Sequence, residues 1–258
     1  MGGVPSIPED RSRQLQVIAA GYSRTGTTSI SIALEHLLQG PVFHGGNQLF
    51  QREDAWMRQW CHMIDADDNP SLLARLRRIT AGYVGIADAP AYILMPELME
   101  LYPDVKVVLV TRDRESWYRS MAPIMKSASM PAWILKVLLW PCPTWRWLPH
   151  YFVWAGKREL NRVGVDFTAE LIDKHNDWVR RHAPKDRFLE MDLKEGWKPL
   201  ADFLGVPVPD IPFPRANDAA EADAVTKRIL LTAGLSWAGI LTTAAAVTWQ
   251  TYRFWRAR

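Results

Sequence analysis

Short apolar runs alternate along the chain with segments whose apolar residues recur at helical spacing. The runs typical of strands cover residues 15–20, 83–87, 105–111 and 187–191, and the helical segments cover 29–38, 94–101, 166–182 and 198–204. Strands that alternate with helices predict a parallel sheet, with ligands bound at the carboxyl ends of its strands. The pattern therefore predicts an α/β fold, a P-loop-like parallel sheet flanked by helices.

A tryptophan-rich segment, residues 130–154, interrupts this alternation. Prolines at 131, 141, 143 and 149 exclude one continuous helix, because proline lacks the amide donor and clashes with the preceding turn. Short helices are expected here. They could form a lid or apolar wall over a ligand, or they could be ordinary core packing, since aromatic clusters serve both purposes.

The segment from Ile229 to Tyr252 contains no charged residue over 24 positions. A helix of that length rises about 36 Å, enough to cross a hydrocarbon layer of about 30 Å. We predict a membrane anchor, while a long amphipathic helix covering the domain is the alternative. The expected division is a flexible N-terminus (1–14), one α/β domain (15–217), a linker (218–228) and the anchor helix (229–252).

Two features of the sequence favour opposite orientations of the anchor in the membrane. The N-terminus has no apolar run typical of a cleaved signal and carries Glu9 and Asp10, so a domain in the cytosol is expected. Arg253, Arg256 and Arg258 lie beyond the span, and the positive-inside tendency favours the opposite orientation.

Composition narrows the class of partner. The chain has 258 residues, of which 48% are hydrophobic, and a net charge of +3 with acids interleaved among bases, so nucleic acid is not an expected partner. Its two cysteines have no partners at metal-ligand spacing, so no metal is expected. The sequence does not predict an oligomeric state.

The candidate chemistry begins at the turn between the first strand and the first helix, Gly21-Tyr-Ser-Arg-Thr-Gly-Thr-Thr28. Backbone amides and the helix dipole at such a turn favour phosphate. Thr27 replaces the lysine that follows the second glycine of a nucleotide P-loop, which weakens an assignment to ATP chemistry. Arg24 instead supplies a cation, and Thr27 and Thr28 supply hydroxyls.

The segment Ser23-Arg24-Thr25-Gly26-Thr27-Thr28 resembles the 5′-phosphosulfate loop of the sulfotransferases, in an arginine-bearing version. A second motif, Val110 to Ser120, carries Arg112 at the end of a strand and Ser120 eight residues on. This resemblance implies that Arg112 and Ser120 bind the 3′-phosphate of 3′-phosphoadenosine 5′-phosphosulfate (PAPS). Arginine offers phosphate a planar fork of donors, which suits that role.

The resemblance extends over residues 15–217 and implies a sulfotransferase-like fold. Arg215 stands where the family closes a basic loop over the 3′-phosphate, although the Arg-Lys-Gly sequence of that loop is absent. In the family a histidine after the second strand is the base. Here that place holds Asp88, which is either the general base or a cap for the following helix, and Ile86 replaces the family's lysine.

His44 follows the first helix and is a second acid/base candidate, with a structural role as the alternative. The resemblance implies a PAPS-dependent sulfotransferase, and Arg24, Asp88 and His44 are the candidates for its catalytic residues. The tryptophan-rich segment favours a hydrophobic acceptor with a hydroxyl or amine. A small-molecule or nucleoside kinase and a membrane-tethered protein without transfer activity are the alternative hypotheses.

Overall fold

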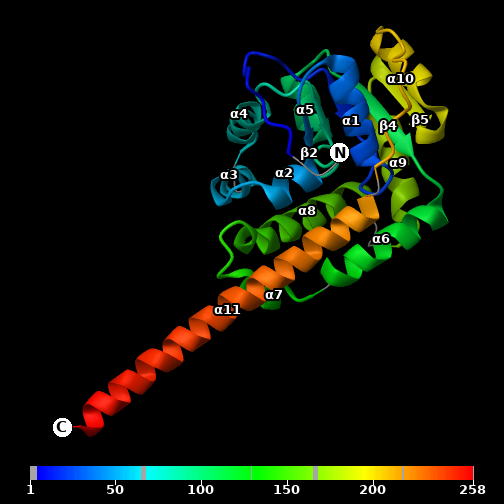
Figure 1. Cartoon of the computed structure of the whole chain (residues 1–258). Coiled ribbons are helices and arrows are strands. Elements are labelled where there is room, and N and C mark those ends of the chain that lie inside the picture. The colour runs from blue at the N-terminus through cyan, green and yellow to red at the C-terminus, as the bar shows by residue number, and fades with distance from the viewer. Residues whose placement is uncertain (1–4, 65–67, 129, 165–167, 217, 258) are drawn as a thin grey trace.

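The computed structural model describes residues 5–64, 68–128, 130–164, 168–216 and 218–257 (Figure 1). Its centre is a parallel sheet with the strand order β2-β3-β1-β4-β5. The strands are β1 (Val17–Ala19), β2 (Val42–His44), β3 (Gly85–Ala87), β4 (Lys106–Thr111) and β5 (Phe188–Asp192). All four neighbouring pairs are parallel, as the alternation of elements predicts.

Alternate residues of the strands face two separate hydrophobic layers. On one face, Val17, Ala19 and Val108 pack with the buried side of α1 (Thr27–Leu38) and α10 (Trp197–Leu204). On the other face, Ile18 and Ile86 belong to the larger cluster under the remaining helices. Because both faces are covered, the central strands β1, β3 and β4 are largely apolar rather than alternating, as is usual in parallel sheets, whereas the edge strand β5 carries Glu190 and Asp192.

The remaining short helices and helical turns surround the sheet, most of them on the face of the larger cluster. They are α2 (Gly45–Gln51), α3 (Asp54–Ile64), α4 (Asn69–Thr80), α5 (Met95–Leu101), α6 (Arg114–Ala128), α7 (Ala132–Leu139), α8 (Leu148–Val163) and α9 (Leu171–His182), with single turns η1 (Trp145–Trp147), η2 (Lys185–Arg187) and η3 (Leu193–Glu195). Strand β2 and helices α2, α3, α4 and α6 are additions to the elements whose bounds the sequence predicted.

The tryptophan-rich segment divides into α7, η1 and α8, short helices as expected. Trp145, Leu148 and Tyr151 are buried in the main core, whereas Trp133 and Trp140 are 67% and 64% exposed. One side of the segment is therefore core packing and the other is an exposed aromatic surface.

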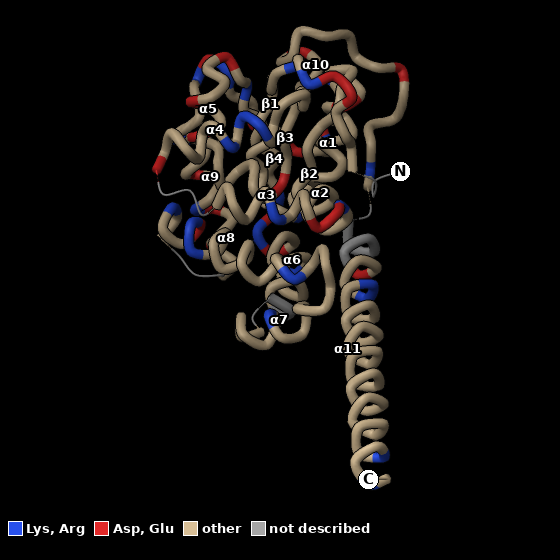
Figure 2. Tube along the Cα trace, turned by 90° about the vertical axis from the view of Figure 1, so that its left-hand side faces the viewer, with Lys and Arg blue, Asp and Glu red and all other residues tan. Residues whose placement is uncertain are grey.

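The C-terminal helix α11 (Asp218–Arg256) is continuous through the segment expected to be a linker. Ala233 is fully buried against the domain, and the side chains from Ala238 to Arg256 are all exposed. The helix leaves the domain and projects far beyond it (Figure 1). Its span Asp223–Arg256 is long and apolar enough to cross a membrane. Figure 2 shows charged residues only near the start and the end of this helix.

Candidate functional site

The phosphate loop lies where the sequence predicts it, between β1 and α1. Gly26 is in the left-handed region at φ 102°, and a Cβ there would lie 2.0 Å from Leu193 Cδ1. Gly21 is enclosed as well, because a Cβ would lie 2.9 Å from the carbonyl oxygen of Val110. Gly21 is therefore required by its close approach to the backbone of β4, and Gly26 is required mainly by its unusual φ, since the Leu193 side chain could move.

The N-terminus of α1 is open to an anion. Gly26 is the N-cap residue, with no side chain bonded to the first amides of the helix. The first amides of a helix have no intrahelical acceptor, and the helix dipole adds partial positive charge there. Hydroxyls of Thr27 and Thr28 stand in the same first turn. These donors fit a phosphate group, which is the group that the loop's sequence predicts.

Aromatic side chains support the loop from beneath. The indole of Trp117 donates to the carbonyl oxygen of Ser23 at 2.9 Å. Tyr22 stacks on Tyr92 with ring centroids 4.7 Å apart and meets Trp117 edge to face at 5.5 Å. Burial raises the pKa values of Tyr22 and Tyr92, so both phenols stay neutral. The loop thus rests on a rigid apolar platform that fixes the position of Ser23.

Asp88 lies at the carboxyl end of β3 and faces the loop. Its Oδ1 accepts a short hydrogen bond from the Ser23 hydroxyl, and its Oδ2 accepts from the Gly46 amide at 3.0 Å. Its backbone is left-handed, at φ 65°. Helix α5 begins at Met95 with Leu94 as its N-cap residue. The Asp88 side chain is thus bonded to the loop and to α2 rather than to the start of α5.

His44, at the end of β2, stands beside Asp88 and the loop threonines. Its Nε2 lies 3.1 Å from Thr27 Oγ1 and 3.3 Å from Thr28 Oγ1, and 3.9 Å from Asp88 Oδ2. Its Nδ1 accepts from the Asn47 amide at 3.4 Å, which caps α2. Because Nδ1 accepts this amide, the neutral ring carries its proton on Nε2. His44 therefore holds the two hydroxyls and caps a helix.

Arg24, Arg112 and Ser120 form the other half of the site. Arg112 Nη1 donates to the carbonyl oxygen of Arg24 at 2.7 Å, and Arg24 Nε donates to Ser120 Oγ at 3.1 Å. Strand β4 and helix α6 thus bring the second motif against the phosphate loop. The Arg24 guanidinium, expected beside the sulfuryl group, contacts a residue expected at the 3′-phosphate.

Arg215 is exposed, and its neighbour in the chain shows where it lies. The amide of Ala216 donates to Ser29 Oγ at 3.0 Å, so the extended segment after α10 returns to the first turn of α1. This places the backbone of Arg215 near the phosphate loop. Among the described residues, the Arg215 side chain forms no hydrogen bond or ion pair with the other site residues.

A buried ionic network that the sequence did not predict lies behind the loop. Arg162 on α8 bonds Glu159 and the carbonyl oxygen of Tyr92, and its Nη2 lies 3.0 Å from His175 Nδ1. His175 Nε2 donates to the carbonyl oxygen of Ala20 at 2.8 Å, immediately before the loop. Burial lowers the pKa of His175, so the ring is neutral, with its proton on Nε2. The network fixes the end of β1.

Sequence reasoning missed Trp117, Tyr92, Gly46 and His175. Trp117 stands inside the Arg112 to Ser120 motif, so its spacing was a usable signal. The other three are brought to the loop by tertiary packing of α2, α9 and the turn after β3, which no local pattern reveals. Within the described ranges, no group of three or more His, Cys, Asp or Glu could hold a metal ion.

Comparison with known proteins places most of the chain in the family that its sequence motifs resemble. A family model described as the sulfotransferase domain matches residues 16–222. The "Ava biosynthesis cluster protein M" of Aspergillus versicolor is 29% identical over 219 residues, which cover 78% of this chain and 80% of the relative.

Two solved structures are also similar. A sulfotransferase from Alicyclobacillus acidocaldarius is 13% identical, with a TM-score of 0.37 over 89% of this chain and 96% of that one. A sulfotransferase from Mycobacterium avium is 14% identical, with a TM-score of 0.38 over 88% of this chain and 69% of that one. The family-model match spans more than half of the chain, and by that match the chain belongs to the sulfotransferase domain family.

Proposed function

We propose that this protein transfers a sulfuryl group from PAPS to a hydroxyl or amine of a hydrophobic small molecule, and that α11 anchors it in a membrane. The observation that carries the proposal is the contact between its two phosphate motifs. Arg112 bonds the backbone of Arg24, and Arg24 bonds Ser120. The site therefore offers donors for two phosphate groups at once, which suits a nucleotide with both a 5′ and a 3′ phosphate.

PAPS supplies the activated sulfuryl group, and the chain's own residues do the rest. The first amides of α1, with Thr27 and Thr28, would hold the 5′ phosphosulfate, while Arg112 and Ser120 would hold the 3′-phosphate. Arg24 bridges the two groups, and its remaining guanidinium N–H groups are available to anionic oxygens. Fixed donors of this kind stabilise charge without reorganising during the reaction.

Asp88 is the residue we propose as general base. Its Oδ2 lies 3.9 Å from His44 Nε2, and each of its oxygens keeps a lone pair beyond the bonds from Ser23 and Gly46. A carboxylate held by two fixed donors is well oriented to accept a proton from the acceptor at Oδ1 or Oδ2. His44 Nε2 carries a proton already, so we assign it to positioning the threonines.

Aromatic residues around Asp88 support a hydrophobic acceptor. Tyr92 lies within 3.5 Å of Ser23 Oγ. Tyr151 on α8 is buried in the main core, and this burial, with the charge of Asp88, raises its pKa. An apolar wall beside the base favours acceptors with an apolar body.

Replacement of Arg112 tests this proposal. PAP, the desulfated product, should raise the melting temperature of the natural protein, and Arg112→Gln should lose most of that rise because a charge-assisted bond to phosphate is absent. Arg119→Gln is the matched control, since Arg119 is also exposed but lies on α6, where its Nη2 donates to Ser116 Oγ at 3.5 Å. Equal PAP-induced rises in melting temperature in both variants would refute the assignment of Arg112 to the PAP site.

The two alternatives give different results in the same experiments. A kinase would respond to ATP with Mg²⁺ rather than to PAP. A tethered protein without transfer activity would bind PAP, show no turnover with any acceptor, and be unaffected by Asp88→Ala.

A further inference from the structure

A basic and aromatic cavity lies outside the sulfotransferase site, between α3, α7, η1 and α8. Its volume is about 700 Å³, and its lining includes the cations Arg58, Lys136 and Arg146 and the indoles of Trp140 and Trp147. Asp54 is bonded by Arg146 and by Trp147 Nε1, so one of the three cations is already neutralised. Within the described part of the chain no carboxylate lines the cavity, which leaves it suited to an anion.

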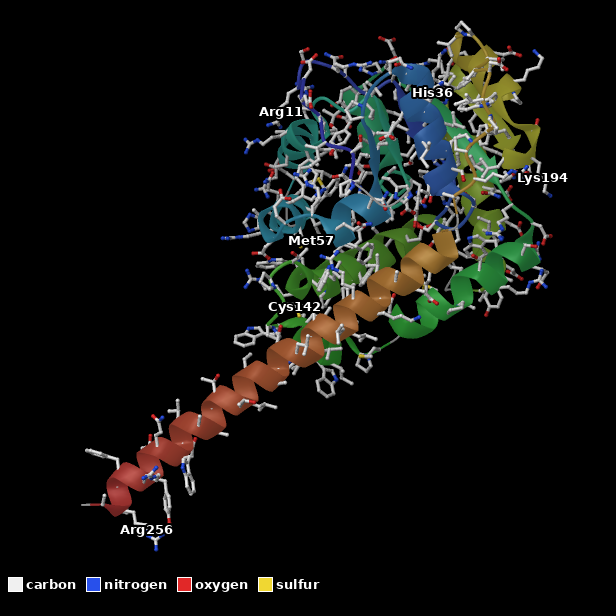
Figure 3. All side chains as sticks on the ribbon, viewed as in Figure 1. Arg11, His36, Met57, Cys142, Lys194 and Arg256 are labelled. Carbon is white, nitrogen blue, oxygen red and sulfur yellow. The ribbon has the colours of Figure 1, made fainter. Side chains whose placement is uncertain are left out.

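The cavity shares a wall with the contact between α7 and α11. Trp140, which lines it, lies 6.3 Å from the ring of Trp237 on α11, and Trp237 Nε1 donates to the carbonyl oxygen of Leu138 at 3.1 Å. Cys142, labelled in Figure 3, marks the same junction beside α11. The cavity therefore lies where the C-terminal helix leaves the domain.

The free part of α11 begins directly after this contact. Residues from Ala238 to Arg256 are exposed and rise about 28 Å as a helix, close to the thickness of a hydrocarbon layer of about 30 Å. Arg256 lies at the far end (Figure 3). If the free part spans a bilayer, the near surface of that bilayer meets the domain at Trp237.

An exposed apolar stripe on α7 faces solvent beside the contact with Trp237. Trp133, Val137 and Trp140 lie at helical spacing on one side of α7 and are 67%, 55% and 64% exposed. Lys136 borders this stripe. Aromatic residues flanked by lysine or arginine are typical of segments at the membrane interface, where the rings enter the headgroup region and the cations meet lipid phosphates.

We propose that this cavity binds the phosphate of an anionic lipid headgroup at the membrane surface, with Arg58 and Lys136 as the ligands and the α7 stripe in the headgroup region. The inference rests on the membrane attachment in the proposed function. A lipid is favoured over a soluble phosphate because the aromatic stripe beside the cavity needs an apolar cover that a free ion does not supply.

Lipid retention by the full chain tests the proposal. The protein in detergent, with excess PAP, is mixed with equal amounts of phosphatidic acid and phosphatidylcholine, and bound lipids are counted by native mass spectrometry. We expect phosphatidic acid to be retained at least about tenfold over phosphatidylcholine, because the two cations together contribute on the order of 2 kcal/mol near an anionic lipid. The double variant Arg58→Gln with Lys136→Gln should lose this preference. Lys174→Gln with Lys185→Gln, which removes the same charge from exposed positions on α9 and η2, should keep it.

Three results would overturn the proposal. Equal retention of the two lipids, or an unchanged preference in the Arg58 and Lys136 variant, would exclude the cavity as an anionic lipid site. Displacement of phosphatidic acid by glycerol 3-phosphate at equal concentration would identify a soluble phosphate as the ligand. Flotation with phosphatidylcholine vesicles separates the two claims: a chain that floats but shows no lipid preference refutes only the cavity, and a chain that does not float refutes the membrane attachment and the lipid site together.

Discussion

Gly26 shows how single residues determine the phosphate loop. It combines φ 102° with a position against Leu193, so a side chain would be both strained and in collision. The Cβ of any other residue would force the Leu193 side chain to move and would strain the backbone at the start of α1. The loop's shape thus depends on this one residue more than on the hydroxyls around it.

Gly26→Ala is therefore expected to lower the free energy of unfolding by about 1–3 kcal/mol and to weaken PAP binding. Chemical denaturation measures the first effect and calorimetry the second. Gly164→Ala is a matched control, because Gly164 has φ 71° but no atom within 4 Å of a new Cβ. Equal losses of PAP binding in the two variants would contradict the account.

Several residues of the site could be predicted from the sequence, and the reason is local. Ser23 to Thr28 lie in one strand-to-helix turn, and Arg112 and Ser120 are fixed by the end of β4 and two turns of α6. Contacts between these motifs could not be predicted. The bond from Arg24 to Ser120 and the bond from Gly46 to Asp88 join residues 96 and 42 positions apart, so they follow from sheet order and helix packing.

At the scale of elements, the position of the loop depends on the buried network between α8 and α9. His175 is neutral because burial lowers its pKa from 6.5, and it holds the last carbonyl group of the sequence before Gly21. The unfolded chain binds a proton near pH 6.5 that the folded chain does not. Stability that is present at neutral pH is therefore lost as pH falls below 6.5 toward the folded pKa.

The free energy of unfolding should fall by up to about 1.4 kcal/mol per pH unit in this window. His175→Gln keeps a donor for Ala20 but does not titrate, so its stability should change less with acidification. Burial opposes ionisation of Glu159, but the bonds and charges of His175 and Arg162 outweigh burial and lower the Glu159 pKa. The stability that ionised Glu159 contributes is therefore lost only at pH values below 4.5. Denaturation at a series of pH values measures the effect, with the exposed His36→Gln as control. Parallel curves for the natural protein and His175→Gln would contradict this role.

Element prediction succeeded where the pattern was strongly periodic and failed where it was not. Strands β1, β3 and β4 lie in apolar runs, β5 alternates apolar and acidic residues, and the alternation of strands with helices predicts that they are parallel. Strand β2 is as short as β1 and β3 but ends in the polar His44, and α2 begins with two glycines, so neither gives a clear apolar pattern. A linker was expected at residues 218–228, but α11 is already helical there and continues into the apolar span.

At the scale of the whole molecule, the exposed apolar part of α11 is the feature that a water-soluble domain would not be expected to carry. Replacing Leu241 and Val247, which are 63% and 58% exposed, by arginine should prevent insertion. Each charge in the middle of a membrane span costs about 3 kcal/mol. Flotation of the full chain with phosphatidylcholine vesicles measures insertion.

The matched control replaces Val208 and Ile211, which are similarly exposed in the connection after α10, by arginine. That variant should float like the natural protein. If the Leu241 and Val247 variant also floats unchanged, α11 is not the anchor.

The central claim is that one nucleotide with a 5′ and a 3′ phosphate binds at the site formed by Arg24, Arg112 and Ser120. Calorimetric titration of the full chain with PAP and with AMP, which lacks the 3′-phosphate, tests it most directly. A charge-assisted hydrogen bond contributes about 1.5–3 kcal/mol, so PAP should bind at least about tenfold more tightly than AMP. Equal affinities for PAP and AMP, or tighter binding of ATP with Mg²⁺ than of PAP, would contradict the account.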